Sequence, residues 1–183
     1  SAEARRSGGD AESKGTDAGK TAGDGRPKAP LPPLKEPANE VMLRVLDRKV
    51  PLRVEAQWKD DILQACEIAK NRNLRLVLLG GMEALEAVDQ LLEIQAIVVV
   101  PPAVAFGVDP LDRGSTRGDV AARLVRAGIP VAFATAGAEG YRYDSLPLVA
   151  QLAMGQGLSR EAALKALTAT AADAIGAQDR LGS

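Results

Sequence analysis

Residues that could carry out chemistry are few in this chain, and histidine is absent from all 183 residues. Histidine is the usual general base near neutral pH and the commonest ligand of catalytic zinc. The single cysteine, Cys66, falls on the apolar face of a predicted helix and has no histidine partner, which favours a small core residue over a nucleophile. Acid, base or metal chemistry would therefore have to use other side chains.

Two groups of polar and aromatic residues follow predicted strands. The first group is Glu55, Gln57 and Trp58, and the second group is Glu139, Tyr141, Arg142 and Tyr143. Residues at strand ends line the sites of α/β barrels, so one interpretation is a small-molecule pocket with carboxylates, an amide and aromatic walls. Loops commonly carry such residues without a ligand, and the second interpretation is a solvated loop and strand end.

The elements that would position these residues alternate between β and α. Apolar runs predict strands over residues 51–57, 74–79, 97–100 and 129–135. Helical spacing predicts helices over residues 40–48, 60–69, 85–92, 120–125, 146–154 and 160–175, the last with Ser159 as its N-cap. Parallel strands that are each followed by a helix predict an α/β fold, about half of a TIM-type (β/α)8 barrel. An open doubly wound sheet is the competing architecture, but its glycine-rich phosphate turn is missing after the first strand.

The first 36 residues differ from the rest in composition. Residues 1–27 contain no large apolar side chain, and residues 28–37 are rich in proline. This composition predicts a flexible, low-complexity and Pro-rich segment over residues 1–36, and a half-barrel over residues 37–183. Half a barrel leaves a strand edge open on each side, which invites pairing with another chain. We expect the partner to be the missing half-barrel or another copy of the chain.

The charge balance bears on other partners. The formal net charge of -1 gives no electrostatic reason to expect nucleic acid or an anionic membrane, so we expect neither as a partner. No apolar run reaches the roughly 20 residues that cross a bilayer. No signal peptide is visible, and because the chain could begin after one, the compartment stays open.

Three stretches resemble one enzyme superfamily. They are DDILQACEIAKNRNLRLVLLGGMEALEAVDQL, RAGIPVAFATAG and LPLVAQLAMGQGLSREAALKALTATAADAIGAQDRLGS. They look like the second half of the metal-dependent amidohydrolases, near the imidazolonepropionase-like branch. The resemblance implies a TIM-barrel hydrolase whose metals are held at strand ends by histidines, often a carboxylated lysine, and an aspartate. Relatives hydrolyse carbon–nitrogen bonds in cyclic amides, ureas or dipeptides with a metal-activated water.

The sequence departs from that pattern at the ligand positions. The histidine expected at the end of the first strand falls on Glu55, and the next falls on Leu79 or Gly80. The aspartate expected after the last strand falls on Ala136. Glutamate can bind a metal, but leucine, glycine and alanine offer no side-chain ligand. We therefore expect neither a metal site nor catalytic residues in this chain.

Three hypotheses about function follow from these departures. The favoured one is an amidohydrolase-like protein that has lost metal-dependent hydrolysis, holds no cofactor and serves in binding or assembly. The alternative is a hydrolase of non-peptide carbon–nitrogen bonds of the cyclic amide type, with zinc as its metal. Its remaining site residues would lie in a preceding segment or a partner chain. The third is a structural subunit whose sheet edges are completed by a partner.

Overall fold

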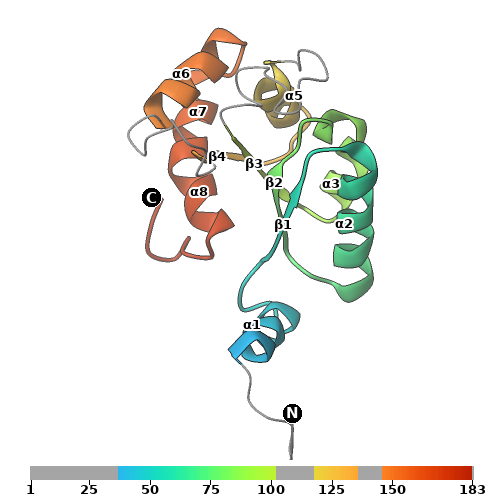
Figure 1. Cartoon of the computed structure of the whole chain (residues 1–183). Coiled ribbons are helices and arrows are strands. Elements are labelled where there is room, and N and C mark those ends of the chain that lie inside the picture. The colour runs from blue at the N-terminus through green and yellow to red at the C-terminus, as the bar shows by residue number, and fades with distance from the viewer. Residues whose placement is uncertain (1–36, 102–117, 136–145, 183) are drawn as a thin grey trace, which may run out of the picture. The chain divides into compact units, whose positions relative to one another are not determined.

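The computed structural model describes residues 37–101, 118–135 and 146–182, which all belong to one compact unit, residues 35–183. The segment predicted to be flexible, residues 1–36, lies outside the described residues. One parallel sheet has the strand order β1-β2-β3-β4 (Figure 1). Its strands are β1 Leu52–Ala56, β2 Leu76–Gly80, β3 Ile97–Val100 and β4 Val131–Phe133.

Helices alternate with these strands along the chain (Figure 1). The first of them are α1 Pro37–Leu46, α2 Lys59–Arg72, the 3-10 turn η1 Ala84–Glu86, α3 Val88–Glu93 and α5 Val120–Arg126. Three more follow β4, and they are α6 Leu146–Gly155, α7 Arg160–Leu167 and α8 Ala169–Ala174. Parallel strands in sequential order with flanking helices form part of a TIM-type barrel, and the predicted α/β fold class is confirmed. None of the described helices is long and apolar enough to cross a membrane.

The larger hydrophobic core lies on the sheet face that packs against α2, α3, α5, α6 and α7. Leu78 and Val98 of the central strands belong to it, together with Ile62, Leu91 and Leu124 of the helices. All five side chains are completely buried. Burial of apolar area is the main driving force of folding, so the contacts on this face contribute most to the stability of the fold.

The opposite face of the sheet is covered by α8. Ala174 packs there against Val77, Ile97, Val99 and Ala132. Two arginines hold the end of this helix. The Arg53 Nη2 donates to the Ala174 carbonyl at 3.1 Å, and the Arg75 Nη2 lies 2.8 Å from the Asp173 Oδ1. The carbonyls at a helix C-terminus carry partial negative charge, which cations stabilise.

Two predicted helices are divided in the structure. The helix predicted over residues 85–92 is the 3-10 turn η1 followed by α3, and the two are separated at Ala87 (φ -125°, ψ 26°). The apolar spacing predicts a single helix over residues 160–175, but the structure divides it into α7 and α8 at Thr168 (φ -123°, ψ -88°). The Thr168 Oγ1 donates to the Leu164 carbonyl at 2.8 Å, a bond that competes with the helical backbone pattern. After the break, α8 packs on the face of the sheet opposite the larger core. The predicted N-cap is confirmed, because the Ser159 Oγ accepts from the Ala162 N–H at 3.2 Å.

We predict that Leu78→Ala lowers the free energy of unfolding by about 3 kcal/mol, because it leaves a cavity in the centre of the larger core. Urea denaturation of the purified chain measures this loss. Leu164→Ala is the matched control, since its side chain is 63% exposed, and its change should stay within about 0.5 kcal/mol. Equal losses in the two variants would contradict this description of the core.

Candidate functional site

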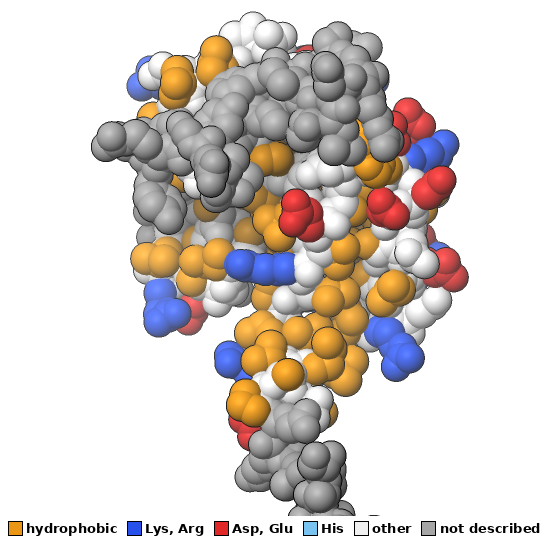
Figure 2. All heavy atoms as spheres, in the orientation of Figure 1, with side chains coloured by type: hydrophobic (Ala, Val, Ile, Leu, Met, Phe, Trp, Pro, Cys, Tyr) orange, Lys and Arg blue, Asp and Glu red, His pale blue; other side chains and the backbone are white. Residues whose placement is uncertain are grey.

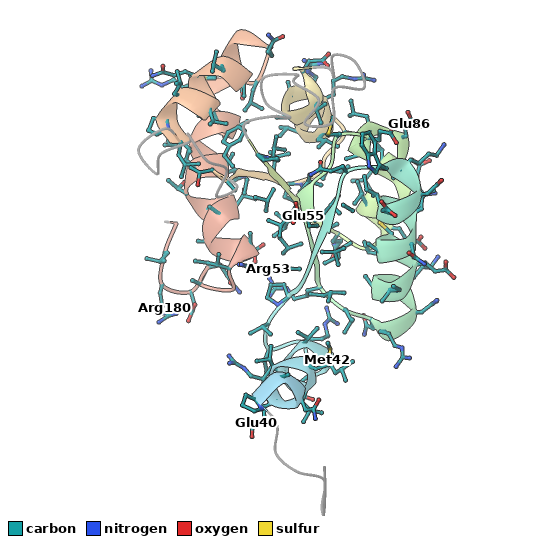
Figure 3. The ribbon with its side chains drawn as sticks, viewed as in Figure 1. Glu40, Met42, Arg53, Glu55, Glu86 and Arg180 are labelled. Atoms are coloured by element: carbon teal, nitrogen blue, oxygen red, sulfur yellow. The ribbon has the colours of Figure 1, made fainter. Side chains whose placement is uncertain are left out.

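The C-terminal ends of β1 and β2 bring two of the expected ligand positions together. The strand register pairs Glu55 with Leu79 and Ala56 with Gly80. Glu55 therefore lies beside the two positions on which the second expected histidine falls, and Figure 3 shows it on β1. This is the end of the strands where TIM barrels place their sites.

These residues do not fit the metal that the resemblance implies. Glu55 is exposed, and its neighbour Leu79 has no donor atom. Among the residues that the structure describes, no three His, Cys, Asp or Glu side chains gather where they could hold a metal ion. A catalytic zinc site needs three protein ligands, so one glutamate is insufficient. Ala136, the position of the expected aspartate, lies outside the described residues.

Gln57 fills the space above Gly80. Gly80 has φ +107°, and a Cβ atom added there would overlap the side-chain amide of Gln57. The backbone conformation favours glycine at this position, whereas the contact with Gln57 involves the end of a flexible side chain. The Gln57 Oε1 is buried, and no hydrogen-bond partner for it lies within the described ranges. An amide packed on the backbone, rather than an open pocket, occupies this end of β1.

Sequence reasoning missed Glu83, which ties the two strand ends together. Its N–H donates to the Gln57 carbonyl at 2.9 Å, and its carboxylate Oε2 accepts from the Lys59 N–H at 2.8 Å. This second bond caps α2, whose own N-cap residue, Trp58, provides no side-chain cap. Trp58 itself is half-buried against the larger core. One indication of this contact was present in the sequence, because Trp58 precedes α2 and cannot cap it with a side-chain acceptor.

Several hollows lie along the sheet, and two of them are lined by residues of β1. A cavity of about 180 Å³ between the sheet and α8 is lined by apolar residues and by Arg53, and it is smaller than the roughly 300 Å³ at which ligand pockets begin. A groove of about 400 Å³ runs between β1 and α2, and Glu55 and Ile68 are among its lining residues. Gln57 and Trp58 line neither hollow. The first predicted group is therefore not gathered around either one, and its ligand role stays a prediction.

The second predicted group lies outside the described residues. It consists of Glu139, Tyr141, Arg142 and Tyr143. Its predicted role in a pocket stays a prediction.

Cys66 is buried on α2, and burial raises the pKa of its thiol. A raised pKa lowers the thiolate fraction at neutral pH, and the thiolate is the reactive form. The interpretation as a core residue agrees with this environment.

Comparison with known proteins finds a structural neighbour. No protein-family model and no curated protein matches the sequence. The fold is similar to an amidohydrolase from Thermotoga maritima MSB8, with a TM-score of 0.68 and 33% sequence identity. The match covers 79% of this chain and 37% of that protein, so the chain spans little more than a third of its length. The chain has an amidohydrolase-like fold.

Gln57→Met should raise the free energy of unfolding by about 1 kcal/mol, because it replaces a buried acceptor without a partner by an apolar side chain of similar size. Chemical denaturation measures the change. Gln90→Met, at an exposed position on α3, serves as the control and should change stability by less than about 0.5 kcal/mol. A destabilised Gln57→Met would contradict the prediction that the unsatisfied acceptor costs stability.

Cys66 should react slowly with iodoacetamide at pH 8 in the folded protein, because burial both shields the thiol and raises its pKa. We expect alkylation at least roughly tenfold slower than in urea-unfolded protein, followed by mass spectrometry. Equal rates in the two states would show that the thiol is accessible and contradict its core position.

Proposed function

We propose that the chain is an amidohydrolase-like protein, of the imidazolonepropionase-like branch, that has lost metal-dependent hydrolysis and serves in binding or assembly. The observation that carries the proposal is the pairing of Glu55 with Leu79 at the strand ends. The position is suited to metal ligands, but one neighbour is aliphatic and the whole chain lacks histidine. A single exposed carboxylate cannot replace a ligand set.

A second candidate function rests on Glu55 itself. Within the described part of the chain its carboxylate is exposed and makes no hydrogen bond or ion pair, so it is available as a ligand. In a hydrolase of cyclic amides, the remaining ligands would come from a preceding segment or a partner chain. The limited span of the chain, 37% of its structural neighbour, is compatible with such a division.

Metal analysis tests whether this chain by itself holds a metal ion. After incubation with zinc and dialysis, we expect the purified chain to retain far less than one equivalent, because too few ligands are present. Elemental analysis of the wild type, Glu55→Gln and the control Glu67→Gln, an exposed α2 position, should give the same low value.

One equivalent of zinc that Glu55→Gln removes and Glu67→Gln preserves would contradict the proposal. That result would assign Glu55 as a ligand and favour the hydrolase.

A further inference from the structure

Strand β1 is an edge of the described sheet, and its backbone alternates between bound and free groups. The Leu52 N–H donates to the Arg75 carbonyl at 2.8 Å, and the Ala56 carbonyl accepts from the Gly81 N–H at 2.8 Å. In a parallel ladder, alternate residues bond to the same neighbour, so Leu52, Val54 and Ala56 face β2. The N–H and C=O groups of Arg53 and Glu55 therefore point away from β2, at the open edge.

The side chains of these same two residues carry opposite charges. Arg53 and Glu55 are both exposed, and because side chains alternate along a strand they lie on the same face of the sheet, the one that α8 covers (Figure 3). Arg53 uses one donor for the Ala174 carbonyl, and a guanidinium has five. Glu55 forms no hydrogen bond or ion pair within the described ranges.

From this arrangement we propose that the β1 edge pairs, antiparallel and across a two-fold axis at Val54, with β1 of a second copy of the chain. In this register Arg53 lies opposite Glu55 of the second copy, and Glu55 lies opposite its Arg53. Both are hydrogen-bonded pairs, because their backbone groups face the open edge, while Val54 meets its own copy in a non-hydrogen-bonded pair. One short strand thus supplies matched backbone bonds and two reciprocal ion pairs.

Apolar surface flanks this edge. The groove between β1 and α2 is lined by Leu52, Val54, Ala65 and Ile68, and Ile68 is 50% exposed. In the proposed dimer, the two-fold axis brings the grooves of both copies together on the face of the joined sheet that carries α2. Four large apolar residues of α1 are also at least 46% exposed, and they are Val41, Met42, Leu43 and Leu46. Figure 2 shows hydrophobic side chains gathered over α1 and around the start of β1.

This β1–β1 pairing names a second copy of the chain as the binding partner. It therefore rests on the proposed function, a role in binding or assembly. A strand from another half-barrel would lie parallel to β1, and then Arg53 would not face Glu55 of a second copy. Charge reversal therefore distinguishes a second copy in the antiparallel register from any other occupant of the edge.

Sedimentation velocity of the full chain over a concentration series tests the proposal. We expect wild type to dimerise. Arg53→Glu and Glu55→Arg each set like charges opposite one another, and should weaken the dimer by roughly tenfold or more. Mixed one to one, the two variants are complementary at both pairs and should form a heterodimer that neither forms alone. The double variant with both changes should again form a homodimer.

The mixing experiment also controls for folding, because a variant that merely unfolds cannot be rescued by its counterpart. Arg160→Glu makes the same charge change at an exposed position of α7, and should dimerise like wild type. A monomeric wild type, or variants that show no preference for each other on mixing, would overturn the proposal. Neither sedimentation result changes the outcome expected from the zinc analysis. The β1 dimer and the loss of the metal site can therefore be refuted independently.

Discussion

The constraint on which this structure depends is that a parallel sheet must satisfy its backbone groups at both edges. Within the described residues, neighbouring strands in the order β1-β2-β3-β4 hydrogen-bond to one another. One face of the sheet is covered by α2, α3, α5, α6 and α7, and the other face is covered by α8. The edge of β1 has no such cover from the described elements. Unpaired N–H and C=O groups on a strand edge favour association with another chain. The open edge of β1 therefore favours the binding of a partner chain.

Much of the fold could be predicted because its strands are short apolar runs. Residues 97–100 are apolar throughout and form a strand buried on both faces, which the sequence pattern alone indicates. The division of the last helix at Thr168 could not be predicted in this way. It depends on a hydroxyl bond to Leu164 and on the packing of α8 against strands that are distant in sequence.

The candidate site was predictable only in part. The adjacency of Glu55 and Leu79 follows from parallel pairing of successive strands, which is a property of the barrel. The capping of α2 by Glu83 and the packing of Gln57 on Gly80 depend on loop geometry that no spacing rule contains. Through these contacts, Gln57 and Glu83 occupy the space at the C-terminal ends of β1 and β2. This packing of the strand ends agrees with the proposed role in assembly.

The most direct measurement of the central claim is amide hydrogen exchange at single-residue resolution along β1, in concentrated and in dilute protein. We predict that the N–H groups of Leu52 and Val54, which face β2, exchange slowly at both concentrations. Arg53 and Glu55 should be protected in concentrated protein and lose that protection on dilution, because a second copy covers their N–H groups. Fast exchange of Arg53 and Glu55 at every concentration, or protection that dilution leaves unchanged, would contradict the account.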